Sequence, residues 1–403
     1  MRHVLEVPGW QERLFLPGPT PLPWAVAQAG AHPMTDPRSE GFAQLVTETV
    51  RSIAQMAGTE GEVAILPASG TGALEALCQN LFQPGDPVLC VVAGAFGRRF
   101  AEIAAGQGLL VTRLEVPMGE APNSGELAEA VTRGPEGASG ASFRGLLLTH
   151  NETSTGVLLP VEELIREARR ARPGLLSVVD SISGFPSVPL DMDRAGIDAV
   201  AAASQKGFMT APGLAVLLLG PRGVAAYQEK RPGRFYFDLG PFLKGHFPYT
   251  APVSLWYALA EAVRLLDEEG QEARSNRHVL LGRMVRAAGL ALHVPPRAMV
   301  ESVASPTVTA LRLPQKVAPA DLRKDMLRHG VRIAGAMGAW SEDTVRVGHV
   351  GAILPVDLLG AIAALEDSLA RLLGREHLPL PFAPGDGVKA AFLAMHEFQE
   401  VMA

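Results

Sequence analysis

The sequence predicts an α/β protein: a large domain with a mostly parallel, doubly wound, seven-stranded sheet, followed by a smaller C-terminal α+β domain. Over the first two thirds of the chain, short apolar runs of strand length alternate with longer segments of helical periodicity. The apolar runs are nearly continuous, as expected of strands that are buried on both faces. After about residue 265 this alternation stops and a different pattern begins.

Seven apolar runs account for the expected sheet. The first, EVAILP at 62–67, leads through the turn SGTG into the helical segment ALEALCQNLF, and PVLCVV at 87–92 leads into FGRRFAEIAAGQG. Intervening helices such as VEELIREARRARP at 161–173 allow the parallel crossovers of a doubly wound sheet. The other runs lie at 109–116, 143–150, 175–180, 198–204 and 214–220.

The smaller domain is expected to mix helices and strands. A polar helix at 274–289 precedes the strands TVTALRLP at 307–314 and TVRVGHV at 344–350, with a helix near 319–329 between them and an amphipathic helix at 355–373 after them. The predicted parts are an N-terminal segment (1–20), a large domain (21–265), a small domain (266–378) and a tail (379–403) that ends in a short helix and whose role the sequence does not indicate.

Composition excludes several classes of function. The chain has 403 residues, with 36 Lys and Arg against 42 Asp and Glu, and a net charge of −6, which argues against a nucleic-acid partner. Its two cysteines are too few for a disulfide framework or a four-ligand zinc site. We find no secretory signal in the first 16 residues and no apolar run long enough for a membrane span, so we expect a cytoplasmic protein without a membrane partner. No metal site is expected, because none of His150, His246, His278 and His349 shows ligand spacing.

Lys206 lies in a turn between two apolar strands, in the segment VAAASQKGFMTAPGLAVLLLG. A lysine enclosed by buried strands is costly to keep charged, so we expect its pKa to be lowered. A neutral amine is the form that condenses with an aldehyde to a Schiff base. Taken alone, the pattern fits an exposed turn lysine equally well.

Two further sites follow strand ends. Asp180 ends the run 175–180, where open α/β sheets bind ligands, and a carboxylate there pairs with a protonated ring nitrogen or simply caps a helix. The turn Ser69-Gly70-Thr71-Gly72 precedes a helix, whose first N–H groups can bind one phosphate group. Together with Lys206 they supply a partner for each of three groups of pyridoxal 5′-phosphate: its aldehyde, its ring nitrogen and its phosphate.

The chain resembles the class V (fold type I) aminotransferases, and among them the alanine/serine–glyoxylate (serine–pyruvate) aminotransferase group. The resemblance runs from FLPGPTPLP at 15–23 to about residue 373. It is carried by six motifs in order: SGTGALEA, HNETSTG, VVDSISG, SQKGF, FPYTAPVSLWYAL and VRVGHVG.

The resemblance implies a role for individual residues. Lys206 would be the Schiff-base lysine and Asp180 the partner of the ring nitrogen. Phe96 would stack on the pyridine ring, although core packing explains it as well, and Ser154 would reach the ring's phenolic oxygen. The residues implied to bind the cofactor are Ser69, Gly70, Thr71, Phe96, Ser154, Asp180, Gln205, Lys206 and Thr250.

For the substrate, the resemblance implies that Arg346 clamps the α-carboxylate, unless it is an ordinary surface strand arginine. Gly18 would bind the substrate as part of an N-terminal loop that closes over it, in a segment that contacts the active site or the partner subunit. Thr250 would reach the phosphate bound by the neighbouring subunit, which implies a homodimer with shared active sites. Where relatives have a tyrosine near this threonine the chain has Phe247, with Tyr249 close by, so a second phosphate contact across the interface is in doubt.

The activity implied is ping-pong transamination of alanine or serine with glyoxylate or pyruvate. A single arginine clamp favours such short monocarboxylic substrates, whereas Arg98, Arg234 or an arginine of the partner would admit dicarboxylates such as aspartate. Transamination of 2-aminoethylphosphonate is an alternative on the same fold. Cysteine desulfuration is disfavoured, because Cys78 and Cys90 lie in elements that should be buried. The alternative from another class is a non-catalytic assembly subunit that retains the fold.

Overall fold

The computed structural model describes residues 12–135, 142–229, 234–298, 300–375 and 380–402. The chain forms two compact units. Of the described residues, those within 22–152 and 158–271 make up the large unit, and those up to 21, the segment 153–157 and those from 272 onward make up the second unit. In the part of the chain described, no helix combines the length and the apolarity needed to cross a bilayer.

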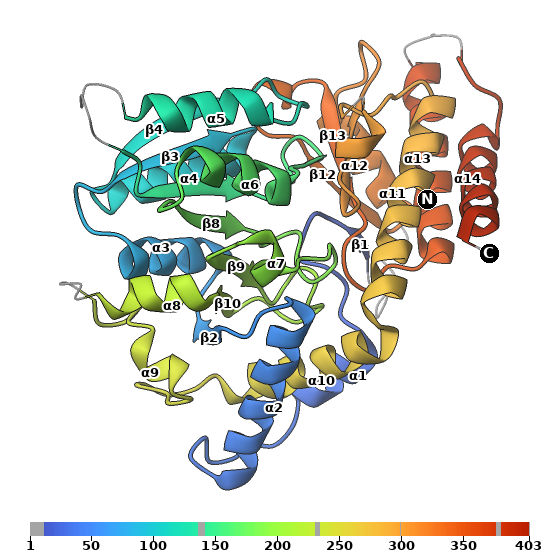
Figure 1. Ribbon diagram of the computed structural model, residues 1–403. Coiled ribbons are helices and arrows are strands. Elements are labelled where there is room, and N and C mark those ends of the chain that lie inside the picture. The colour runs from blue at the N-terminus through green and yellow to red at the C-terminus, as the bar shows by residue number, and fades with distance from the viewer. Residues whose placement is uncertain (1–11, 136–141, 230–233, 299, 376–379, 403) are drawn as a thin grey trace. The chain divides into compact units, whose positions relative to one another are not determined.

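The large unit contains the predicted mostly parallel sheet of seven strands, which confirms the fold class (Figure 1). Six of the seven strands run in the same direction, and only β10 is antiparallel to its neighbours. In their order across the sheet the strands are β2 (Glu62–Pro67), β10 (Leu214–Leu219), β9 (Ala199–Ala203), β8 (Leu176–Asp180), β5 (Gly145–Thr149), β3 (Pro87–Val92) and β4 (Leu110–Glu115).

Helices cover the sheet of the large unit. Side chains of α3, α4 and α8 pack with strand residues into one buried apolar cluster, and α3 and α8 lie side by side in Figure 1. The predicted helix at 161–173 is observed as α6, which buries an apolar stripe and leaves its charged residues outside. The helices are α1 (Trp24–Gly30), α2 (Glu40–Met56), α3 (Gly70–Leu81), α4 (Ala95–Gly106), α5 (Ser124–Arg133), α6 (Val161–Ala171), α7 (Met192–Ala195), α8 (Pro221–Gln228), α9 (Gly240–Leu243) and α10 (Val253–Glu269). The short strands β6 (Asn151–Glu152) and β7 (Val157–Leu158) follow β5.

The second unit is the expected mixture of helices and strands around a sheet of order β1-β12-β13-β11. No apolar run in the sequence indicated β1 or β12: β1 has three residues and pairs in parallel with β12. The strands are β1 (Arg13–Phe15), β11 (Val308–Arg312), β12 (Val331–Gly335) and β13 (Thr344–Gly348). The helices are α11 (Gln271–Ala291, whose first residue belongs to the large unit), α12 (Pro319–Leu327), α13 (Pro355–Arg375) and α14 (Asp386–Met402), with 3-10 turns at Glu301–Val303 and Gly338–Trp340.

The tail ends in a helix of 17 residues, α14, longer than the short helix expected. It packs on α13 through apolar side chains that belong to the same buried cluster. The Glu366 carboxylate on α13 accepts hydrogen bonds from the backbone N–H groups of Gly385 and, at 3.0 Å, Gly387 at the start of α14. The end of the chain is therefore part of the second unit.

Candidate active site

The carboxyl ends of the parallel strands share one edge of the sheet in the large unit. The register places Asp180 next to Thr149 on one side and Ala201 on the other, so that β5 and β8 end at the same level and β9 ends two residues beyond it, at Ala203. Open α/β sheets bind ligands at this edge. Seven of the nine residues expected to bind the cofactor lie at or after such strand ends: Ser69, Gly70 and Thr71 after β2, Phe96 after β3, Asp180 in β8, and Gln205 and Lys206 after β9.

Asp180 is a buried carboxylate at the end of β8, with 4% of its surface exposed. Its Oδ1 accepts a hydrogen bond of 3.0 Å from the Ile182 backbone N–H. Burial raises the pKa of Asp180 to about 7, and the negative charge of Glu152 adds to the rise, while the Ile182 N–H and the Lys206 charge oppose it. A protonated ring nitrogen beside this carboxylate would stabilise its charged form.

Lys206 lies half-buried in a tightly held turn between β9 and β10. Ser204 fixes the turn, because its hydroxyl donates to the Ala211 carbonyl at 2.7 Å and accepts from the Leu214 N–H at 3.2 Å. A Cβ atom at Gly207 would lie 2.8 Å from Pro186, so the turn packs too closely on the neighbouring loop for a side chain. The charge of Lys206 lowers the pKa of Asp180, which places the amine within electrostatic reach of the carboxylate.

The start of α3 approaches the loop that follows Asp180. Ser69 caps the helix, with its hydroxyl accepting a hydrogen bond of 3.3 Å from the Gly72 N–H. A Cβ atom at Gly70 would lie 2.8 Å from the Ile182 side chain, so only glycine allows this approach. Gly70 is buried, whereas Ser69 and Thr71 are exposed at the helix end. The first N–H groups of a helix have no intrahelical partner and point outward from this end.

Two buried residues of the HNETSTG motif join this region, although the sequence analysis gave them no role at the site. The His150 backbone N–H donates to the Asp180 carbonyl at 2.8 Å, and its Nδ1 lies 2.9 Å from the Ser181 hydroxyl. Burial lowers the pKa of His150 to about 4, so its ring is neutral near pH 7. Glu152 is completely buried and binds the start of α4. The signal in the sequence was an acidic residue, Glu152, three residues beyond the end of β5 in a motif with no other acidic residue.

Arg346 is placed in the second unit, on β13, with 9% of its surface exposed. Its Nε donates to the Gly335 carbonyl at 2.8 Å and its Nη1 to the Thr153 carbonyl at 3.0 Å. It is therefore not a surface strand arginine. Ser154, which is fully buried, follows Thr153 directly, so the second unit brings Arg346 next to the segment that carries Ser154.

Gly18 belongs to the same region of the second unit. The Thr20 hydroxyl donates to the Val350 carbonyl at 2.7 Å, and a Cβ atom at Gly351 would lie 2.5 Å from that hydroxyl. A Cβ atom at Gly348 would overlap the backbone of Leu16. The segment 16–20 thus packs against the chain that follows Arg346. Residues 1–11, the rest of the predicted N-terminal segment, lie outside the described residues.

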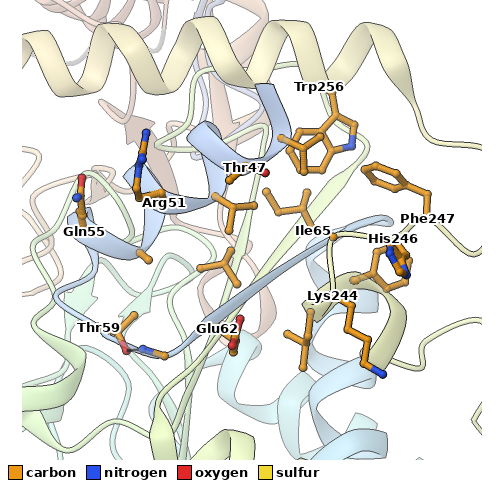
Figure 2. Close-up of a pocket in the computed structure, with 18 of the residues that line it drawn as sticks. Thr47, Arg51, Gln55, Thr59, Glu62, Ile65, Lys244, His246, Phe247 and Trp256 are labelled. Atoms are coloured by element: carbon orange, nitrogen blue, oxygen red, sulfur yellow. Dashed lines mark hydrogen bonds between the residues drawn. The ribbon is translucent and has the colours of Figure 1, made fainter. Parts of the chain in front are cut away.

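Thr250 is exposed in the loop between α9 and α10. Its neighbour Phe247 points its ring toward Phe42 and Trp256, with centroid distances of 6.0 and 5.7 Å. Phe247 and Trp256 line a cavity of about 510 Å³, which is also bounded by residues of α2, β2 and the segment 242–246 (Figure 2). The Tyr249 hydroxyl donates to the Tyr236 carbonyl at 3.0 Å. None of the residues expected to bind cofactor or substrate lines this cavity.

Comparison with known proteins identifies the family. The family model "Aminotransferase class-V" matches residues 24–334. The chain is a class V aminotransferase by family. The serine–glyoxylate aminotransferase of Methylorubrum extorquens is 32% identical over 96% of both chains. A Synechococcus protein named "Soluble hydrogenase, small subunit" is 36% identical over 94% of this chain and 97% of its own length. Among solved structures, an aspartate aminotransferase from Thermus thermophilus has a TM-score of 0.82 at 31% identity, covering 89% of this chain and 99% of its own.

The family is one of enzymes that depend on pyridoxal phosphate, and the residues of this chain fit that group. Gln205 Oε1 is buried and has no hydrogen-bond partner within the described chain, as expected of an amide that faces a bound molecule. Asp180 would pair with the ring nitrogen, Lys206 with the aldehyde, and the start of α3 with the phosphate. The names of the relatives differ in substrate, so the family defines the class of chemistry and not the amino acid.

Both thiols of this family member, Cys78 and Cys90, are buried. Cys78 is 1% exposed and Cys90 is not exposed. Burial raises the pKa of Cys78 to about 12 and also raises that of Cys90. Thiols in this state are poor nucleophiles, which argues against desulfuration. No group of three or more His, Cys, Asp or Glu side chains among the described residues is arranged to hold a metal ion.

Proposed function

We propose that the protein transaminates a small amino acid, alanine or serine, with a small 2-oxo acid, glyoxylate or pyruvate, by a ping-pong mechanism. The observation that carries the proposal is the pair Asp180 and Lys206. A buried carboxylate and an amine on adjacent strand ends lie within electrostatic reach of each other, in a member of a family that uses pyridoxal phosphate.

When bound, pyridoxal phosphate would supply an aldehyde for the amino group and a ring that accepts electrons from the substrate α-carbon. Lys206 Nζ would bind the cofactor and then take the proton from that α-carbon. Asp180 would hold a proton at the ring nitrogen, since its charged form gains a cationic partner there. The start of α3, with Ser69, Gly70 and Thr71, and the Gln205 amide would bind the phosphate. Phe96 would stack on the ring, and Ser154 would hold its phenolic oxygen.

Arg346 would bind the α-carboxylate of the substrate, and the segment with Gly18 would cover it. The two other arginines considered as a second clamp have other partners. Arg98 forms an ion pair of 3.1 Å with Glu115, and Arg234 donates to Asn80 Oδ1 at 3.0 Å and lies over the Tyr227 ring. These contacts support substrates with one carboxylate. Aspartate and 2-aminoethylphosphonate remain the alternatives within the fold, the first because a relative from Paracoccus denitrificans is named L-aspartate–glyoxylate aminotransferase.

The proposed assembly is a homodimer, with Thr250 of one subunit at the phosphate bound by the other. The exposure of Thr250 supports this part of the proposal. Phe247 and Tyr249 do not support a second contact of this kind, because the ring of Phe247 packs inward and the hydroxyl of Tyr249 donates to a carbonyl of its own chain.

The test is to trap the cofactor and to scan substrates. Borohydride reduction in the presence of pyridoxal phosphate, followed by peptide mapping, should label Lys206, and a label on another lysine would contradict the site. Alanine, serine, aspartate and 2-aminoethylphosphonate are then added singly to the yellow protein. We expect alanine or serine to bleach the visible band and glyoxylate or pyruvate to restore it.

A second candidate is a non-catalytic assembly subunit, favoured by the name of the Synechococcus relative. It predicts a protein that takes up no pyridoxal phosphate and responds to no amino acid. A colourless protein after incubation with the cofactor would therefore replace the first proposal by the second.

A further inference from the structure

Glu152 is a fully buried carboxylate in the large unit, on β6 just beyond the end of β5. A buried carboxylate is stable only where hydrogen bonds or opposite charge compensate the loss of water. Its Oε2 accepts hydrogen bonds from the backbone N–H groups of Phe96 at 3.0 Å and Gly97 at 2.9 Å, and its Oε1 lies 3.3 Å from the Phe96 nitrogen. Both donors belong to the first turn of α4.

This arrangement supplies α4 with a cap from a distant segment. The residue that precedes the helix, Gly94, has no side chain to cap it. The first four N–H groups of a helix lack intrahelical partners, and the positive end of its dipole favours a nearby negative charge. Glu152, 56 residues away from Phe96 in the sequence, provides both the acceptor and the charge.

The first turn of α4 is also held from its other side. A Cβ atom at Gly97 would lie 2.8 Å from the Val91 carbonyl oxygen, so the turn packs directly on the end of β3. Phe96 projects from this turn and is half-buried, with the Arg99 guanidinium 5.1 Å from its ring centroid. Any shift of the turn would therefore move the Phe96 ring.

The chain connects Glu152 to Asp180 as well. Two residues before Glu152, the His150 N–H donates to the Asp180 carbonyl. The backbone that carries the ring-nitrogen partner and the backbone that carries the stacking residue are thus joined through the segment 150–152. We propose that Glu152 is a positioning residue, which fixes the first turn of α4, and with it Phe96, relative to Asp180. The inference rests on the proposed function, because Phe96 and Asp180 would both contact the pyridine ring of the cofactor.

The experiment compares Glu152→Ala and Glu152→Gln with Glu115→Gln as the matched control. Glu115 also contacts the first turn of α4, but through an exposed ion pair with Arg98 in which both side chains are about half-exposed. Glu152→Gln keeps an oxygen that can accept a hydrogen bond from a backbone N–H group, but it removes the negative charge. Thermal unfolding of each apoprotein is recorded first, so that a loss of folding is separated from a loss of position.

Two readouts then report position. Hydrogen exchange of the peptide that contains Phe96 and Gly97 reports the cap in the apoprotein, and titration with pyridoxal phosphate reports its dissociation constant and the visible circular dichroism per bound cofactor. Glu152→Ala loses two charge-assisted hydrogen bonds to the first turn of α4. We therefore expect the Phe96 and Gly97 amides to exchange at least about tenfold faster. The dissociation constant for pyridoxal phosphate should rise about tenfold, and the visible circular dichroism per bound cofactor should weaken. Glu152→Gln should lie between Glu152→Ala and the wild type, and Glu115→Gln should match the wild type.

The outcomes separate the two proposals. If folded Glu152→Ala binds the cofactor with unchanged affinity and dichroism, the positioning role is wrong and the proposed function stands. If the wild type itself does not bind pyridoxal phosphate, the proposed function and the cofactor-positioning role are both wrong. In that case faster exchange in Glu152→Ala would still assign Glu152 as the cap of α4. Equal exchange of the Phe96 and Gly97 amides in the wild type and the three variants would show that Glu152 does not cap α4 either.

Discussion

The residues proposed to act on cofactor and substrate fall into two regions that are built differently. The strand-end cluster of the large unit, which comprises Asp180, Lys206 and the start of α3, is placed by the register of adjacent sheet strands. The Arg346 cluster of the second unit, which comprises Gly18, Ser154 and Arg346, is assembled from three distant segments. Arg346 and Thr153 are 193 residues apart in the sequence, and Thr20 and Val350 are 330 apart.

This difference predicts different responses to substitution. Backbone pairing holds the strand-end cluster, so its side chains can change with little movement, and the effect should be on electrostatics and chemistry. Side-chain bonds to carbonyls and close glycine contacts hold the Arg346 cluster, so a change there should affect substrate affinity or the stability of the second unit.

The largest effect is expected for Lys206→Ala in the strand-end cluster. Because this amine is proposed to carry both the cofactor and the α-proton, transamination should fall on the order of 10⁴-fold. Steady-state rates with alanine and glyoxylate measure the loss. The exposed Lys244→Ala is the control and should match the wild type. Activity within tenfold of the wild type in Lys206→Ala would show that another group binds the cofactor and transfers the α-proton.

A pH-dependent effect is expected for Asp180→Asn in the apoprotein. The pKa of Asp180 is raised from 3.8 to about 7, so the folded state favours the protonated form, and its contribution to stability is lost as the pH rises from about 4 to about 7. The variant escapes this loss, on the order of 4 kcal/mol, and should become increasingly more stable than the wild type over that range.

Denaturant unfolding of both proteins at pH 4, 5.5 and 7.5 measures this difference. Titrating groups that do not interact with Asp180 change alike in the two proteins and cancel, whereas the interactions of Asp180 with Glu152, Lys206 and Arg99 are part of the difference measured. A difference that stays constant with pH would mean that the pKa of Asp180 is not raised in the folded apoprotein.

In the Arg346 cluster, Arg346→Lys should separate substrate binding from cofactor binding. Lysine lacks the planar fork that pairs with a carboxylate at two points, so KM for the amino acid should rise about 10- to 100-fold. The visible spectrum of the bound cofactor should not change. Arg332→Lys is the control, since Arg332 on neighbouring β12 pairs with Glu12 at a partly exposed site. An altered spectrum in Arg346→Lys would contradict the assignment of substrate binding to the Arg346 cluster and cofactor binding to the strand-end cluster.

The smallest effect is expected for Gly351→Ala, in the contact between the segment 16–20 and the chain after Arg346. Gly351 has φ of 81°, and an added Cβ atom would lie 2.5 Å from the Thr20 hydroxyl. The free energy of unfolding should fall by about 2 kcal/mol. Gly360→Ala in α13 is the matched control: its Cβ would meet open space, and the change should stabilise the helix by up to about 1 kcal/mol. Denaturant unfolding measures both.

Much of the strand-end cluster could be predicted from the sequence because it depends on local order. Continuous apolar runs indicated buried parallel strands, and such strands place the residues that follow them at one edge. The observed strands match all seven predicted runs to within about two residues at each end. The short strands β1 and β12 gave no such signal, because three to five residues carry little periodicity and their pairing is decided by distant partners.

The sequence by itself determined the fold class, the family and the order of the chemically active residues along the strand ends. Only the tertiary structure decided that Glu152 caps α4, that Arg98 and Arg234 are engaged with other partners, and that Phe247 packs inward. The physical reason is that periodicity and strand order are properties of neighbouring residues. Compensation of a buried charge, in contrast, depends on which distant backbone groups the fold brings within hydrogen-bond distance.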